Sequence, residues 1–165
     1  MKNIDRLVSS IIYEFDGDRK RVEHTMKVFA YSRLIGLSEN LSAGDQETLE
    51  TAALLHDIGI PAAIKEYGSA AGPNQEKTGA VISKRILDEL HPEIAGAVSH
   101  LVGHHHSFNY DGGLLLTILF ESDALVNLSE GNMPIESIGT IKQKLFKTAL
   151  GKTIIEGTYA KELEA

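Results

Sequence analysis

The apolar residues of this chain recur with the spacing of amphipathic helices, whereas the alternation typical of a half-buried strand is weak. Glycine, proline and helix-capping residues separate the apolar segments. For example, Asp16-Gly17-Asp18 interrupts the first segment, and Ser42 with Asp45 resembles a capping box that opens a later one. The pattern predicts helices at residues 2–15, 19–37, 43–58, 75–90, 92–105, 114–129 and 134–149, a loop at 59–74, a turn at 111–113 and an ambiguous tail at 152–163.

These segments predict an all-α fold. About seven helices joined mostly by short connections are typical of a compact single-domain helical bundle. A chain of 165 residues has the size of one domain and can bury a hydrophobic core. We found no internal repeat, low-complexity tract or linker, so we expect residues 1–165 to form a single domain.

Composition excludes several classes of function. The net charge of −7 argues against binding a nucleic-acid polymer. The chain has no cysteine, so any metal would be held by histidine, aspartate or glutamate. Apolar runs are too short for a membrane span, and the N-terminus lacks the pattern of a signal-peptide cleavage site. We therefore expect a cytoplasmic protein that does not associate with membranes.

Four polar residues fall on predicted apolar faces. His24 follows the spacing of the apolar stripe of its helix, and His56-Asp57 ends the apolar segment AALLHDIG. Asp123 lies among leucine, phenylalanine and valine, and residues 114–130 contain no lysine or arginine to pair with it. Taken singly, each has an ordinary explanation: a core histidine with one hydrogen bond, a turn residue, or an ion pair with a distant base. Taken together, two imidazoles and two carboxylates on inward faces form a suitable ligand set for a divalent transition metal.

A histidine cluster follows at Gly103-His104-His105-His106. Consecutive residues of a helix point about 100° apart, so all three rings cannot face the same site. One interpretation is a solvated helix end, where histidine is favoured by the helix dipole. The other is that one or two of these rings complete a second metal site or contact a phosphate.

The order His24, His56-Asp57, Asp123 resembles the H…HD…D signature of the HD superfamily of metal-dependent phosphohydrolases. The stretch AALLHDIG is itself close to the commonest sequence of that motif, and the resemblance covers a core of about residues 20–130. It implies an all-α HD-type domain in which His24, His56, Asp57 and Asp123 hold a metal ion.

Members of the superfamily with two metals add histidines between the HD pair and the last aspartate. One of these usually precedes a Gly-Ala pair, but here the segment before Gly79-Ala80 contains Gln75 and Glu76 instead. A later histidine pair of the family resembles His104-His105, or His105-His106 in a shifted register. Glu76, His104 and His105 would then contribute to a second site; alternatively, one ion is bound and these histidines face the substrate.

The resemblance implies hydrolysis of a phosphate ester by a metal-activated water. Asp57 or Asp123 would accept a proton from that water while it binds the metal, and His104 or His105 would stabilise the developing charge or protonate the leaving group. A phosphate also needs positive neighbours, for which the sequence offers Lys65, Lys84 and Arg85.

The sequence thus predicts a phosphomonoesterase or phosphodiesterase for a nucleotide or another small phosphorylated metabolite. The alternatives are a di-iron oxygenase of the HD type and a non-catalytic sensor that keeps the metal. One or two ions are expected, and the sequence does not distinguish Mn, Fe, Ni, Co, Zn and Mg. A homodimer is compatible with the apolar helices at both ends.

Overall fold

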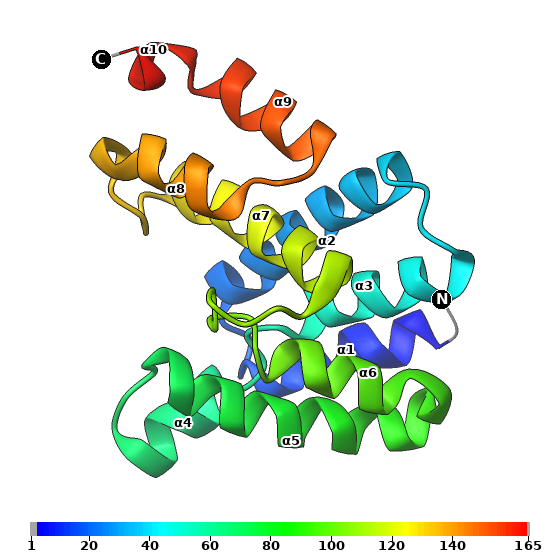
Figure 1. The fold of residues 1–165 in the computed structure, drawn as a ribbon. Coiled ribbons are helices and arrows are strands. Elements are labelled where there is room, and N and C mark those ends of the chain that lie inside the picture. Colours follow the sequence, from blue (N-terminus) through cyan, green and yellow to red (C-terminus); the bar gives the residue numbers. More distant parts are fainter. Residues whose placement is uncertain (1–2, 165) are drawn as a thin grey trace.

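The structure is a computed structural model that describes residues 3–164. Within this range it contains ten α-helices, one short 3₁₀ turn and no strand, which confirms the predicted all-α single-domain bundle with more helices than the seven expected (Figure 1). The helices are α1 (Ile4–Glu14), α2 (Arg19–Ser38), α3 (Ala43–Leu55), α4 (Ile60–Tyr67), α5 (Gly72–Leu90), α6 (Pro92–Val102), α7 (Gly113–Glu130), α8 (Ile138–Leu145), α9 (Ala149–Thr158) and α10 (Ala160–Leu163), with η1 at Ile135–Ser137.

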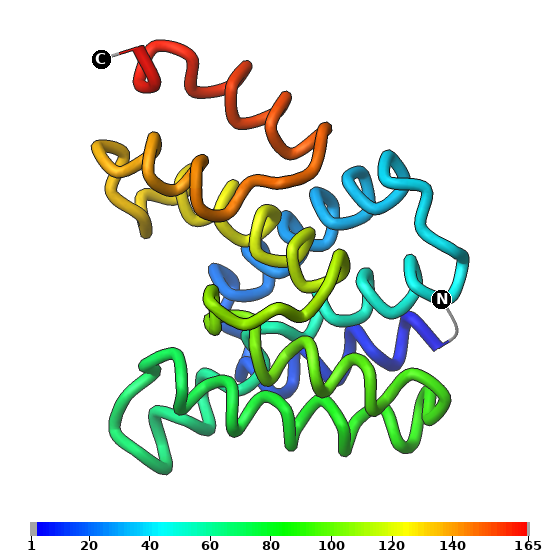
Figure 2. The backbone as a smooth tube through the Cα atoms, in the orientation of Figure 1, coloured from blue at the N-terminus to red at the C-terminus, as the bar shows by residue number. Residues whose placement is uncertain are grey.

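The helices form three groups around a common core. Helices α2, α3 and α7 pack against one another in the middle, and α5 and α6 run side by side along one edge of the molecule (Figure 2). Helices α8, α9 and α10, orange to red in the figures, lie on the opposite side of α7. Because α7 is covered from several directions, apolar side chains all round it are buried, including Leu116, Ile118 and Leu119.

Two predicted segments, the loop at 59–74 and the helix at 134–149, were wrong. The segment 59–74 was expected to be a loop, but it contains α4, because Pro61 lies in the first turn of a helix and so begins it instead of ending it. The helix expected at 134–149 is divided, since the backbone amides of Lys147 and Thr148 donate hydrogen bonds to the buried carboxylate of Glu121. The side chain of Thr148 then caps α9.

Residues 3–164 contain no helix with the length and hydropathy needed to cross a membrane.

Candidate metal centre

Three separate segments bring histidine and aspartate side chains to one point. His24 comes from the second turn of α2, His56 and Asp57 follow the end of α3, and Asp123 lies in the middle of α7. His24, His56 and Asp123 are all buried, at 7%, 0% and 5% exposure. The structure therefore brings together all four residues of the predicted metal set.

Three of these side chains form an inner group, which we define as His24, His56 and Asp123. The Nε2 atom of His24 lies 3.1 Å from Asp123 Oδ1, and His56 Nε2 lies 3.6 Å from the same oxygen. The two Nε2 atoms face each other at 3.3 Å. Three potential ligand atoms thus converge from three helices, in an arrangement that could hold a divalent cation.

A second, outer group consists of Asp57, His105 and His106. Within it, Asp57 also faces the inner group. Its Oδ2 atom is 3.5 Å from His56 Nε2, and its Oδ1 atom is 3.5 Å from His105 Nε2. One ligand atom from each outer residue lies within 4.8 Å of the others. The two carboxylate oxygens of Asp57 therefore face different groups of imidazoles, the geometry expected of a carboxylate shared by two cations.

Backbone hydrogen bonds fix the orientation of two of the rings. His56 Nδ1 lies 2.8 Å from the carbonyl oxygen of Ala53, and His105 Nδ1 lies 2.6 Å from that of Val102. Since a carbonyl oxygen only accepts, each Nδ1 carries a proton that it donates. When such a ring is neutral, the opposite nitrogen presents its lone pair to the centre, as metal-binding histidines do.

The histidine pair that reaches the centre is His105-His106, the shifted register of the two considered from sequence. His104 instead donates from Nδ1 to the carbonyl oxygen of His100, and its ring stacks on Tyr110 at 4.3 Å between centroids. Helix α6 ends at Val102, so His104 still lies over the surface of that helix, while the turn that follows aims the next two rings inward. The structure thus does not bring His104 to the candidate centre.

Gln75, and not Glu76, lies at the centre. The side-chain amide nitrogen of Gln75 is 2.5 Å from His106 Nε2, and its buried oxygen has no hydrogen-bond partner in residues 3–164. The Glu76 carboxylate accepts hydrogen bonds from the backbone amide of His106 and the hydroxyl of Ser107. Glu76 therefore holds the segment that carries the histidine pair, and the structure does not place it among the candidate ligand groups.

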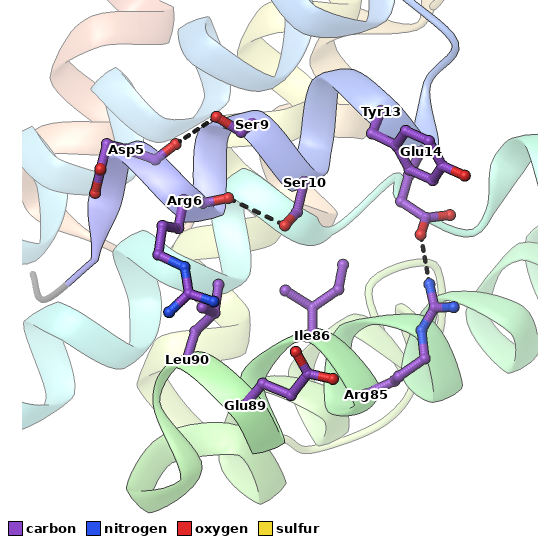
Figure 3. Close-up of a pocket in the computed structure, with 10 residues that line it drawn as sticks. All are labelled: Asp5, Arg6, Ser9, Ser10, Tyr13, Glu14, Arg85, Ile86, Glu89 and Leu90. Carbon is purple, nitrogen blue, oxygen red and sulfur yellow. Dashed lines mark hydrogen bonds and ion pairs between the residues drawn. The ribbon is translucent and has the colours of Figure 1, made fainter.

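The predicted substrate-binding cations lie elsewhere. Lys65 is exposed on α4, and Lys84 pairs with Asp88 on the exposed side of α5. Arg85 pairs with Glu14 beside a groove of about 520 Å³ between α1 and α5 (Figure 3). The cavity that contains the candidate centre is lined by other residues, so the structure does not bring these three cations to it. Their order along the chain does not reveal this, because it does not specify the direction in which each helix points its side chains.

The cavity over the centre has a volume of about 640 Å³ and includes two residues that sequence reasoning missed. Glu130 Oε2 lies 2.9 Å from His24 Nδ1, and its other oxygen accepts a hydrogen bond from Lys27. Asn127 donates a hydrogen bond to Asp123 Oδ1 from one turn further along α7. The one-turn spacing of Asn127 was a usable signal, whereas nothing local in the sequence connects Glu130 with His24.

The pKa values of several members of the cluster are shifted strongly by the charges of neighbouring members. Burial alone would lower the pKa of His56, but Asp57 and Asp123 outweigh it and raise that pKa to about 9. Burial would likewise raise the pKa of Asp57, yet His56 and His105 lower it to about 2. For His106, burial and the neighbouring His105 lower the pKa to about 4. Asp57 and Asp123 are thus ionised at neutral pH. Their negative charge needs compensation, either by protonated imidazoles or by metal ions.

We expect the metal-free protein to lose stability as the pH rises from about 6.5 to about 9. The pKa of His56 is raised from 6.5 to about 9 on folding. The protonated ring therefore contributes stability that is fully present below the unfolded pKa and is lost as the pH passes the folded value. Urea unfolding in chelator across this range measures the effect, and His56→Asn is the control that should flatten the profile. An unfolding midpoint that does not fall in the parent protein would contradict the expectation.

A close backbone approach positions Gln75 against the centre. A Cβ atom on Gly59 would lie 2.3 Å from the carbonyl oxygen of Gln75 and 2.4 Å from the amide nitrogen of Gly79. Only a residue without a side chain lets the start of α4 meet α5 at this distance. The glycine after the His-Asp pair is thus a packing requirement of the candidate site.

We expect Gly59→Ala to destabilise the protein by about 1–3 kcal/mol or more, because the added methyl group meets backbone that cannot rotate away. Gly96→Ala is the matched control: this exposed glycine lies inside α6, and an added Cβ meets no atom within 4 Å. The control should stabilise by about 0.5–1 kcal/mol through helix propensity. Urea unfolding measures both changes, and equal stabilities of the two variants would refute the packing argument.

Comparison with known proteins agrees with the geometry. The chain matches the family model of the HD domain over residues 21–128, which is more than half of its length. The chain therefore belongs to the HD domain family, the superfamily of metal-dependent phosphohydrolases, as its sequence motif predicted. No curated protein and no solved structure matched the chain.

Proposed function

We propose that this protein is a metal-dependent phosphohydrolase that cleaves a phosphate ester of a small metabolite. The observation that carries the proposal is the position of Asp57, whose two oxygens face the inner and the outer group of imidazoles. Membership of the HD domain family supports the same reaction class.

The residues present fit a site for two cations. His105 Nε2 and Gln75 Oε1 are both buried, and within residues 3–164 neither has a hydrogen-bond partner. Such atoms are costly unless something else binds them. The ligand atoms are imidazole nitrogens and carboxylate oxygens, which suit Mn²⁺, Fe²⁺, Co²⁺, Ni²⁺ and Zn²⁺. We propose that His24, His56 and Asp123 hold one ion, that His105 and His106 hold the other, and that Asp57 binds both.

Bound cations would polarise the phosphoryl group and make water a nucleophile at neutral pH. The protein side chains would hold the cations and orient the phosphoryl group and the attacking water. Asp57 and Asp123 supply ionised carboxylates at the centre, and Asp57 accepts a proton from the attacking water. Gln75 lines the same cavity, where its side-chain amide can hydrogen-bond to a phosphoryl oxygen not held otherwise.

Glu130 acts on the centre through His24. It accepts the hydrogen bond from Nδ1 and thereby fixes the ring with Nε2 toward Asp123. We expect Glu130→Ala to weaken metal binding by about 10–100-fold, the usual cost of losing such a partner. Glu130→Gln, which keeps an acceptor oxygen, should recover part of the affinity. Competition with a coloured chelator measures the binding, and unchanged affinity in Glu130→Ala would exclude the role.

A second candidate is oxygenase chemistry with two irons. It is favoured by one observation: four histidines and two aspartates converge here, a sufficient set for two iron ions. The two activities separate in one experiment, in which anaerobically purified protein is loaded with Fe²⁺ or Mn²⁺ and then given oxygen and small organic substrates. Substrate-dependent oxygen consumption that needs Fe²⁺ would replace the hydrolase proposal.

The hydrolase proposal is tested by loading metal-free protein with Mn²⁺, Fe²⁺, Co²⁺, Ni²⁺, Zn²⁺ or Mg²⁺ and measuring turnover of p-nitrophenyl phosphate and bis-p-nitrophenyl phosphate. We expect turnover only after loading, and the two substrates distinguish a phosphomonoesterase from a phosphodiesterase. Metal binding without any turnover, of these substrates or of a panel of phosphorylated metabolites, would favour the sensor. The expected cytoplasmic location and the homodimer stay predictions.

A further inference from the structure

The cavity over the candidate centre is lined almost entirely by polar and charged residue types. Among the described residues that line it, Ile60 is the one aliphatic side chain, and there is no phenylalanine or tyrosine. Ligand sites for flat heterocycles usually carry apolar or aromatic walls on which the ring can stack. Apart from Ile60, the lining therefore offers a nucleobase no aliphatic, phenylalanine or tyrosine side chain to pack against.

The two aromatic residues that follow the histidine cluster do not supply that surface either. Phe108 packs edge-on against Phe120 at 5.1 Å between ring centroids. Tyr110 is stacked on His104, on the surface of α6. Both rings are engaged outside the lining of the cavity. Since neither ring lines the cavity, neither supplies a stacking surface inside it.

A row of cations follows the face of α2 that carries His24. Lys20 and Arg21 precede His24 by one helical turn and Lys27 follows it by one turn, so the four side chains share one side of the helix. All three cations line the cavity. We call Lys20, Arg21 and Lys27 the basic row.

The members of the basic row differ in their partners. Arg21 pairs with Asp18, and Lys27 pairs with Glu130. Lys20 is exposed at the rim of the cavity, and no carboxylate in the part of the chain that the structure describes forms an ion pair with it. The rim therefore keeps a cation available beyond the cluster that would hold the reacting phosphate.

We propose that the basic row binds a second anionic group of the substrate, so that the preferred substrates are compact, polar phosphate esters with a further phosphate or carboxylate and no nucleobase. This inference rests on the proposed function and narrows it. One phosphoryl group lies at the His/Asp cluster, and the second anion contacts Lys20 and Arg21. Asn127 and Asn132 line the same cavity and offer amide groups to substrate hydroxyls.

The test compares kcat/KM of the Mn²⁺-loaded protein for fructose bisphosphate, fructose monophosphate, AMP and p-nitrophenyl phosphate. We expect the bisphosphate to exceed both the fructose monophosphate and AMP by about tenfold or more, the typical effect of one charged hydrogen bond. The Lys20→Ala/Arg21→Ala variant should lose this preference, because its kcat/KM for the bisphosphate should fall toward that for the fructose monophosphate. Lys152→Ala is the matched control, because Lys152 is exposed on α9, and it should retain the preference.

AMP turnover equal to or better than that of the bisphosphate would overturn the inference and leave the hydrolase proposal intact. If no metal supports turnover of any ester, the hydrolase proposal fails. Calorimetric measurement of fructose bisphosphate and AMP binding to the metal-loaded protein then tests the inference separately. Tighter binding of fructose bisphosphate than of AMP, lost in the double variant, would support it. Equal affinities for the two ligands would refute it.

Discussion

Asp57→Ala is expected to lower metal-dependent phosphate release by about 10³-fold or more, because several kcal/mol of charge stabilisation depend on the bound cations and each 1.36 kcal/mol is tenfold in rate. Asp57 is the carboxylate that faces both imidazole groups, so its loss removes one proposed ligand from each ion. The measurement is kcat/KM of the metal-loaded variant together with its metal content. Both should fall, with the metal content dropping below that of the parent protein.

Two controls make this result specific. Asp88→Ala removes an exposed carboxylate that pairs with Lys84 and should leave activity and metal content unchanged. Asp57→Asn keeps the shape and one oxygen acceptor but loses the charge, so it should bind metal weakly and remain folded. Full, metal-dependent turnover in Asp57→Ala would refute the proposed role of this residue.

Removal of the metal is expected to abolish hydrolysis and to lower the thermal stability of the protein. A ligand present at 1,000 times its dissociation constant stabilises the folded state by about 4 kcal/mol. For a chain of this size that free energy corresponds to roughly 10 °C in Tm. The structural reason is that buried carboxylates and imidazoles converge at one point, where a bound cation would compensate the carboxylate charge.

Differential scanning calorimetry with chelator, followed by reloading with Mn²⁺, measures this effect. Activity and Tm should return together on reloading. In Asp57→Ala the chelator-induced shift should be smaller, since only the inner group would still hold an ion tightly. A Tm that is the same before and after verified metal removal would show that the cluster is stable by itself and would contradict the expectation.

Agreement between the predicted and observed fold was best where helices carry strong local signals. The helix predicted at 19–37 corresponds to α2, which begins after the cap Asp18, and 114–129 corresponds to α7, which ends at Gly131 in the left-handed conformation. Agreement was poorest at residues 59–74, because a proline near a helix can either begin it or end it.

At the candidate site, too, residues with a local sequence signal could be predicted and residues without one could not. His24, His56, Asp57 and Asp123 could be chosen from sequence because each is a polar residue on an apolar face and such a residue needs a partner. The register of the histidine cluster could not be chosen, since it depends on where α6 ends and on how Glu76 holds the next turn. Lys84 and Arg85 lie close to the motif in sequence, but their helix directs them toward Asp88 and Glu14.

The sequence by itself determined the all-α class and the choice of a four-residue cluster whose side chains could hold a cation, because periodicity and the cost of burying charge act locally along each helix. Only the tertiary structure decided which groups surround that cluster. It turned His105 and His106 inward and His104 outward, and it brought Gln75, Glu130 and the basic row to the cavity. The physical reason is that contacts across the bundle depend on how helices far apart in sequence pack together, as Glu130 and His24 do across α7 and α2.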